Sequence, residues 1–370
     1  MSEVRTVAPA AMLLALLSLA GPANAQTCPA IPDDGIEDDA VIQACLNGGG
    51  LVSLASGVYN IRLGLRLRVS GTVFTSSAPP ARPRLVAHPD IMGNASWNTP
   101  ILATADPTPN NWEISHMTFD GNRFYRNNAW TCNGSYNPGG SNLIVKGSGF
   151  VIRYVESTQA LCGSALEVNG SDYYIYDSVF TANGFADGQY YPFTFADGLT
   201  ALRCEGGTIW NNYFVDNTDV DLIVGTGTYC TVRFNTVQHS NQFGFAGMQV
   251  GGNNANLSGS SISNNSVQAG YNLLSFGLVL GAHPWNGNHD TSHVGTVEDN
   301  AVSGAVMNVL VEGVYGGVFT GNSISGSQGN RGYAGCQIYG DYFVGAHVGS
   351  LTLQGGWIGI TSFDTGICVP

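Results

Sequence analysis

Three aspartates on two neighbouring apolar segments are the residues of this chain best suited to acid–base chemistry. Asp197 begins the segment DGLTAL, and Asp219 and Asp221 lie at the start of DVDLIV. In an extended strand, side chains two positions apart leave the same face, about 6.5 Å from each other. If the residues between the two segments form one turn of a coil, the strands pair at about 4.8 Å. The sequence therefore predicts that three carboxylates share one small patch of surface.

Such a patch fits glycoside hydrolysis. Two carboxyl groups about 5 to 5.5 Å apart cleave with retention of the sugar's configuration. A pair about 6.5 to 9.5 Å apart leaves room for an attacking water, and the configuration is inverted. Crowding of like charges raises the pKa of one group, which then stays protonated and serves as the acid. We predict Asp197, Asp219 and Asp221 as catalytic residues. A solvated acidic face and a calcium site are the competing interpretations of the same cluster.

The residues predicted to bind a sugar surround this patch. Polar side chains of the neighbouring coils should face outward, and aromatic rings in inserted loops are suited to stacking on sugar faces. These candidates are Glu167, Tyr190, Tyr191, Gln249, His283 and Trp285. The histidines around Trp285 have no spacing that would make them converge, so no metal or other cofactor is predicted, with calcium at the acids left open.

A repeat predicts how these residues are positioned. Segments of the form polar, any residue, apolar recur at intervals of 22 to 35 residues, beginning at Arg153, Asp177, Asn212, Asn235, Asn265, Asn300 and Asn322. The shorter intervals fit a bare coil of three strands, and the longer ones fit a coil that carries a loop. Asparagine tolerates the left-handed backbone of a turn and can bond to its counterpart in the next coil, so ladders of stacked asparagines are expected.

The N-terminal part supplies a leader and a cap. An apolar run over residues 10–20, followed by Ala23-Asn24-Ala25, is typical of a signal peptide cleaved after Ala25. The segment that begins at Asp38 then has an acidic start, an apolar stripe and a glycine run at its end, which predicts a short helix. We divide the chain into a signal peptide at 1–25, a cap with the first coils at 26–107, and β-helix repeats at 108–370.

This opening block resembles that of secreted right-handed parallel β-helix enzymes of the pectin-lyase-like superfamily. It has an acidic turn, the motif IQAC, a glycine run and GVYNI at the start of the first coil. The resemblance implies an all-β fold, a single-chain right-handed parallel β-helix (solenoid) whose end is closed by the helix. The acid placement resembles polygalacturonase-type hydrolases, in which an Asp-Gly strand is followed by paired acids and then a Gly-rich segment with a histidine. Here Phe245 or Ala246 holds that histidine's place.

Composition limits the partners. The formal net charge is −13 and Lys146 is the single lysine, so nucleic acid and anionic membranes are not expected as partners. A carbohydrate polymer or oligosaccharide is expected instead. The polygalacturonase-type hydrolases carry an Arg-x-Lys strand that this chain lacks, and the missing lysine favours a neutral sugar, with a polyanionic substrate left open if arginines gather locally. All eight cysteines follow the predicted cleavage point, which predicts disulfides and a secreted or periplasmic location, with Cys204 and Cys230 as a favoured pair. Association between copies of the chain is left open.

Three functions remain compatible with the sequence. The first is a secreted glycoside hydrolase, from which a fructan-type transferase is not separated. The second is a polysaccharide lyase, with Lys146, Arg153 or Tyr190 as the base and calcium held by the acids. The third is a non-catalytic glycan-binding or adhesion protein that uses the solenoid as a rod.

Overall fold

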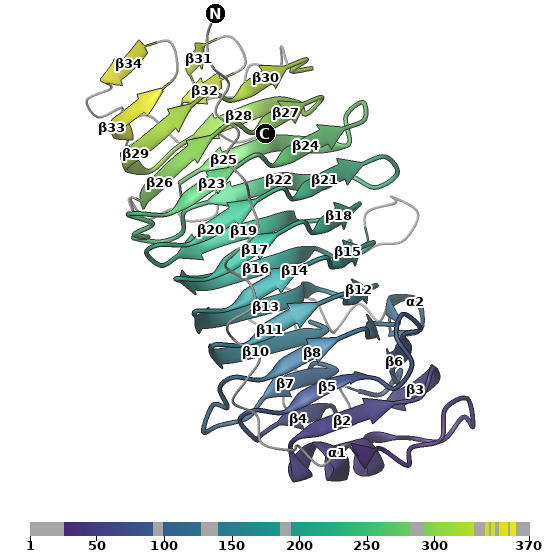
Figure 1. The fold of residues 1–370 in the computed structure, drawn as a ribbon. Coiled ribbons are helices and arrows are strands. Elements are labelled where there is room, and N and C mark those ends of the chain that lie inside the picture. The colour runs from purple at the N-terminus through teal and green to yellow at the C-terminus, as the bar shows by residue number, and fades with distance from the viewer. Residues whose placement is uncertain are drawn as a thin grey trace, which may run out of the picture.

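The computed structural model describes residues 26–91, 99–126, 140–185, 194–281 and 292–328, and four further strands between residues 337 and 359. This part of the chain is a stack of β coils with one cap helix at its N-terminal end (Figure 1). The predicted all-β solenoid is confirmed. The predicted signal peptide lies outside the described residues, and the division at residue 107 stays a prediction.

Each coil contributes one strand to each of three sheets, which we call sheets A, B and C. Sheet A contains β1 (Gln26–Thr27), β2 (Leu51–Leu54), β5 (Val73–Ser76), β8 (Glu113–Ser115), β11 (Val151–Arg153), β14 (Tyr174–Tyr176), β17 (Thr208–Trp210), β20 (Thr231–Arg233), β23 (Ser261–Ser263), β26 (Ser292–Glu298), β29 (Val314–Thr320), β33 (Val348–Leu353) and β34 (Gly356–Gly359). Sheet B contains β3 (Gly57–Ile61), β6 (Pro83–Ala87), β9 (Thr118–Asp120), β12 (Glu156–Thr158), β15 (Val179–Thr181), β18 (Tyr213–Val215), β21 (Thr236–His239), β24 (Ser266–Ala269), β27 (Ala301–Ser303) and β30 (Ser323–Ser325).

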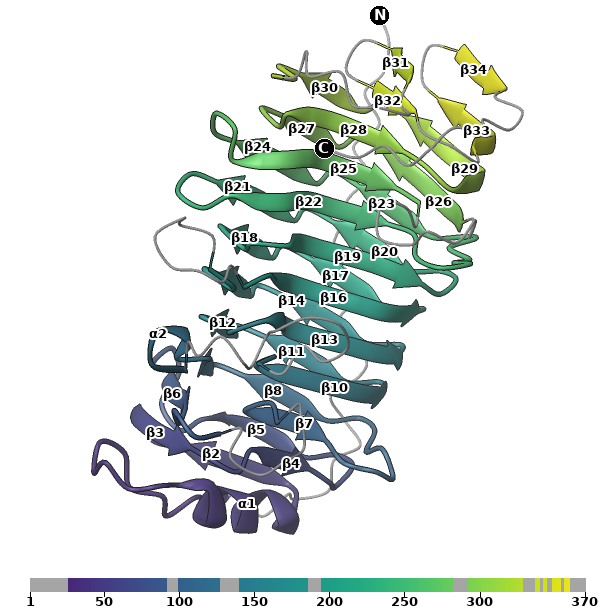
Figure 2. The same ribbon diagram turned by 180° about the vertical axis from the view of Figure 1, so that it is seen from behind.

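Sheet C positions the predicted site. In spatial order it contains β4 (Leu65–Leu67), β7 (Leu102–Thr104), β10 (Leu143–Ser148), β13 (Gly163–Ser171), β16 (Ala196–Glu205), β19 (Val220–Thr226), β22 (Gly244–Val250), β25 (Leu274–Leu280), β28 (Met307–Val311), β32 (Tyr342–Val344) and β31 (Gln337–Tyr339). Neighbouring strands are parallel in all three sheets, except for the antiparallel pairs β31–β32 and β33–β34. The view from behind shows the same stack of coils (Figure 2).

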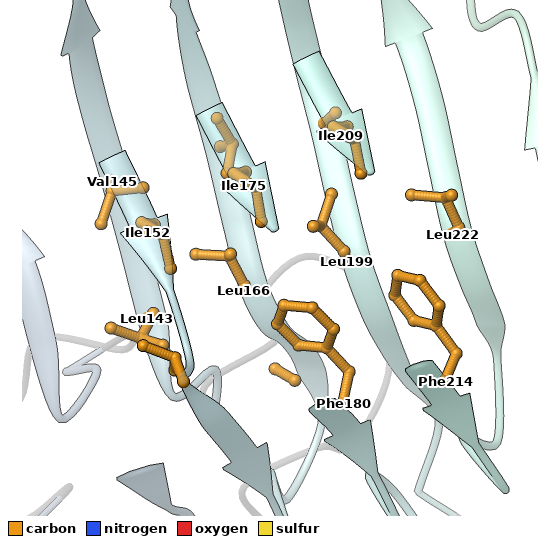
Figure 3. Close-up of a cluster of buried hydrophobic side chains, with 14 of the residues drawn as sticks. Leu143, Val145, Ile152, Leu166, Ile175, Phe180, Leu199, Ile209, Phe214 and Leu222 are labelled. Carbon is orange, nitrogen blue, oxygen red and sulfur yellow. The ribbon is translucent and has the colours of Figure 1, made fainter. Parts of the chain in front are cut away.

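The interior is built from columns of matching apolar side chains. Leu143, Leu166, Leu199 and Leu222 occupy the same register position of four successive sheet C strands, and none is exposed (Figure 3). Isoleucines of sheet A and the stacked rings of Phe180 and Phe214 fill the opposite side of the coils. Burying each large apolar side chain contributes about 1.5–3 kcal/mol, so the columns hold consecutive coils in register.

The cap helix α1 (Asp39–Gly48) covers the N-terminal end of the stack (Figure 1). Its own residues Ile42, Cys45 and Leu46 are buried, and a disulfide joins Cys45 to Cys28. The helix closes an end that would otherwise expose apolar core and unpaired strand edges. The expected helix is therefore confirmed. The second helix, α2 (Arg123–Arg126), is a single turn in the loop after β9.

The expected asparagine ladder runs through the turns that precede sheet B. Amide groups bond from Asn212 to Asn235, Asn265, Asn300 and Asn322 in succession, with nitrogen–oxygen distances of 2.9 to 3.0 Å. All five side chains are buried. Because each amide satisfies a neighbour in the next coil, these residues stabilise the turns and are not available for catalysis.

The outer face of sheet C is less polar than predicted. Outward side chains from β19 onward form a second apolar cluster, which comprises Val220, Ala246, Phe276, Val279, Val306, Met307 and Leu310. These residues are at most 6% exposed. The expectation that polar residues of these strands face outward therefore does not describe the outer face from β19 onward, where apolar residues also point outward. Polar outward positions of the described strands are concentrated in the N-terminal half of the sheet.

The predicted disulfide between Cys204 and Cys230 is present and joins the end of β16 to the residue before β20. Disulfides of this kind persist in oxidising compartments, which supports an extracellular location. Within the described residues, no helix is both long and apolar enough to cross a membrane.

Candidate functional site

Asp197 is the best-supported carboxylate of the predicted site. It is the second residue of β16 and lies opposite Ser164 of β13 in the register of sheet C. The hydroxyls of Thr200 and Ser164 donate to its Oδ2 at 2.6 and 3.3 Å, and the backbone amide of Val220 donates to Oδ1 at 3.1 Å. Burial raises the pKa of Asp197 to about 6, although these three hydrogen bonds act to lower it.

Asp219 lies beside Asp197 in the next coil, as the sequence predicted. Its amide donates to the carbonyl of Ala196 at 3.2 Å, and the amide of the next residue, Val220, contacts the Asp197 carboxylate. Burial and the neighbouring charge of Asp197 raise the pKa of Asp219 well above its usual value. Among the described residues, no hydrogen-bond donor contacts the Asp219 carboxylate. The two carboxyls thus form a coupled pair in which hydrogen bonds stabilise only one anion.

Asp221 does not share this surface. Its side chain is fully buried, with Oδ1 accepting from the Asn217 amide at 2.7 Å and Oδ2 lying 2.6 Å from Nε2 of His239. The expectation that Asp219 and Asp221 leave one face is wrong because side-chain alternation is broken at Asp221. The residues on either side of it, Val220 and Leu222, belong to the outer apolar cluster and to the core, respectively. Asp221 instead ends a second amide ladder, in which Asn183 donates to Asn217.

His239 is the residue that the sequence analysis missed. It is the last residue of β21, and its side chain is fully buried. Its Nδ1 lies 2.9 Å from the carbonyl oxygen of Gln242, so both ring nitrogens face acceptors. Burial alone would lower the pKa of His239, but the Asp221 carboxylate offsets this and the pKa rises to about 8. Because both ring nitrogens of His239 face acceptors, both must carry a proton, and the ring is therefore protonated.

The surroundings of His239 fix its position. The amides of Ser240, Asn241 and Gln242 all donate to Oδ1 of Asp216, which holds the turn whose carbonyl meets the ring. Gly244 lies against the ring, and a Cβ added there would come within 2.4 Å of it. The only sequence signal was a histidine at the end of a repeat strand, which does not distinguish an inward from an outward side chain.

Glu167 and Gln249 lie on sheet C but away from the pair. Glu167 pairs in register with Thr200 and not with Asp197, so it is displaced from Asp197 by three residues along the strand direction. Burial raises the pKa of Glu167, and the charge of Lys146 partly counters this. Gln249 is 4% exposed, and its amide donates to the carbonyl of Gly251 at 3.1 Å. Its side chain thus bonds within its own coil, and its predicted sugar contact stays a prediction.

The remaining predicted residues lie outside the described part of the chain. These are Tyr190, Tyr191, His283 and Trp285. Across the residues that are described, no three His, Cys, Asp or Glu side chains gather in a way that could hold a metal ion. The inward turn of Asp221 explains why the three aspartates do not form such a group. Arg153, considered above as a base, lies on sheet A and pairs with Glu113 at 2.9 Å.

Comparison with solved structures defines the fold class. The chain superposes on an exopolygalacturonase from Thermotoga maritima with a TM-score of 0.54 and 12% identity, covering 94% of this chain and 96% of that one. It superposes on an alginate lyase from Paenibacillus sp. strain FPU-7 with a TM-score of 0.53 and 12% identity, covering 84% and 97%. The chain therefore has the right-handed parallel β-helix fold that the sequence predicted. No family model matches the sequence, and no curated protein does.

Proposed function

We propose that this protein is a secreted glycoside hydrolase in which Asp219 is the general acid and Asp197 the anionic partner. The observation that carries the proposal is the asymmetry of the pair. Both pKa values are raised, but three donors favour the anion of Asp197 and no described residue does so for Asp219. Above about pH 6 the pair therefore holds one proton, which lies mainly on Asp219. This is the protonation state that hydrolysis needs.

The chemistry follows from this state. The protonated Asp219 donates its proton to the glycosidic oxygen as the bond to the anomeric carbon breaks, so that the leaving sugar departs as a neutral alcohol. The Asp197 carboxylate either attacks the anomeric carbon or takes a proton from the water that does. Ser164 and Thr200 orient Asp197 through their hydroxyl groups. Asp221, with His239, is assigned a positioning role below the pair.

The fold comparisons support a carbohydrate substrate, since an exopolygalacturonase and an alginate lyase share this architecture. The two described disulfides support secretion. The substrate class is a polysaccharide or oligosaccharide that lies across the coils on the outer face of sheet C.

The test is a screen of acidic and neutral polysaccharides with product analysis, repeated with Asp219→Asn. We expect new reducing ends and a loss of kcat of about 10²- to 10⁴-fold in the variant. Asp177→Asn, on a turn near sheet A, is the matched control and should keep full activity. Products that absorb in the ultraviolet as unsaturated uronides would establish a lyase instead. Glycan binding without any cleavage, unchanged in Asp219→Asn, would establish a binding protein.

A further inference from the structure

A cavity with basic residues on its wall opens on the outer face of sheet C, on the N-terminal side of the acid pair. Its volume is about 380 Å³, within the range of about 300–1,000 Å³ that small-molecule sites occupy. Arg66 of β4 and Lys146 of β10 contribute the positive charges, and Asp106, after β7, contributes one negative charge. Thr104 and Thr108 add hydroxyl groups to the wall.

The two cations of this cavity are among the described basic residues that form no ion pair. Five described arginines have an acidic partner within 4.0 Å, namely Arg62, Arg82, Arg84, Arg153 and Arg203. Within the described residues, neither Arg66 nor Lys146 has such a partner. Arg68, Arg126 and Arg233 likewise form no ion pair with a described acid, so Arg66 and Lys146 are distinguished by their place together on the wall of the cavity. They offer donors to an external anion.

The surroundings of Arg66 also disfavour its charged form. Burial lowers the pKa of Arg66, and the nearby charge of Arg68 lowers it further. A bound anion would offset this like-charge repulsion. The half-buried guanidinium and the exposed ammonium thus lie on the wall of a cavity that favours negative charge.

The register of sheet C places this cavity on the same face as the acid pair, displaced along the strands. Arg66 of β4 pairs in register with Ala103 of β7. Ala103 pairs with Ile144 of β10, and Ile144 pairs with Glu167 of β13. Glu167 in turn pairs with Thr200, which bonds to Asp197. At about 4.8 Å a strand, β10 lies about 10 Å and β4 about 19 Å from β16. An oligosaccharide of a few units that extends across these strands would reach from the pair to the cavity.

We propose that the cavity is a subsite for the carboxylate of an acidic sugar, with Arg66 and Lys146 as its ligands, in the polymer on which the acid pair acts. The location of the scissile bond rests on the proposed hydrolase function, whereas the anion subsite itself does not. This proposal departs from the expectation of a neutral sugar. The single lysine of the chain and a half-buried arginine are both placed where a uronate would lie, so the scarcity of lysine does not argue against an acidic substrate.

Calorimetric titration with oligogalacturonate and oligomannuronate tests the subsite. At least one of these should bind, and its carboxyl-reduced neutral counterpart should bind about tenfold more weakly or worse, as expected when hydrogen bonds to a charged group are lost. Arg66→Gln and Lys146→Gln should each reduce uronate binding to a similar extent and flatten its dependence on salt. Arg62→Gln, an exposed arginine paired with Glu37, is the matched control and should bind as the wild type does. Circular dichroism and urea midpoints confirm that the variants are folded.

Three results would overturn the subsite: equal binding of the uronate and its reduced counterpart, unchanged binding in both variants, or binding of sulfated oligosaccharides with no binding of uronates. The outcome is separable from that of the hydrolase proposal. Uronate binding that depends on Arg66 and Lys146 without any cleavage would retain the subsite and refute the hydrolase. Cleavage of a neutral glycan by both variants at the wild-type rate would retain the hydrolase and refute the subsite.

Discussion

The buried pair of Asp221 and His239 makes the stability of the fold depend on pH in a defined direction. The folded pKa of His239 is about 8, above the value of about 6.5 expected in the unfolded chain. A raised histidine pKa contributes stability that is fully present below about pH 6.5 and is lost as the pH rises through about 8. The difference of about 1.5 pKa units corresponds to about 2 kcal/mol.

Asp221→Asn should remove this dependence. An asparagine there can accept from Asn217 and donate to Nε2 of a neutral ring, while Nδ1 still donates to Gln242, so every hydrogen bond is retained without the charge. The free energy of unfolding, measured by urea denaturation from pH 6 to pH 9, should fall with pH by about 2 kcal/mol more in the wild type than in the variant.

The difference between the two proteins isolates His239 from the other titrating groups. The nearest of these is Asp216, 4.0 Å from Nδ1, and it is present in both proteins. His88→Gln, which alters a partly exposed histidine near Asp90, should keep the wild-type slope. Parallel pH profiles of wild type and Asp221→Asn would refute the charged pair.

Further outcomes follow from the site and the cross-links. Thr200→Val removes the strongest hydrogen bond to Asp197, so the pKa of Asp197 should rise further and the acidic limb of the kcat/KM profile should move to higher pH, measured by initial rates from pH 4 to 8. Asp219→Asn removes a carboxyl whose ionisation is opposed by burial and by Asp197, so the urea midpoint at pH 7 should rise although activity falls; a lower midpoint would contradict the raised pKa. Replacing Cys204 and Cys230 together by alanine opens a loop of 26 residues and should cost about 3.5 kcal/mol, measured by the same denaturation.

The coil architecture could be predicted because it depends on features that recur. Apolar residues at one register position, such as Leu166 and Leu199, and an asparagine at each turn are repeated often enough to reveal the period. The neighbourhood of Asp197 and Asp219 followed from that period alone. The same reasoning found the disulfide between Cys204 and Cys230, which are one coil apart.

The direction of individual side chains could not be predicted where a strand begins or ends. Asp221 was expected outside because regular alternation was assumed from Asp219 onward. The alternation is broken between Val220 and Leu222, and a buried histidine stabilises the inward carboxylate of Asp221. His239 could not be recognised, because its partner Asp221 is 18 residues away and its burial depends on how two turns pack. The apolar outer positions, such as Phe276, likewise follow from packing between coils.

The two halves of the outer face of sheet C together limit where a glycan can lie. From β19 to β28 the outward apolar cluster is closed to solvent, whereas from β4 to β16 the outward positions include Arg66, Lys146, Glu167 and Asp197. A polymer that reaches the acid pair therefore finds polar partners on the N-terminal side of it. The basic cavity lies on that same side, and its cations Arg66 and Lys146 form no ion pair with the described acids. The position of the acid pair and the charge of the cavity thus agree on the direction in which the glycan extends.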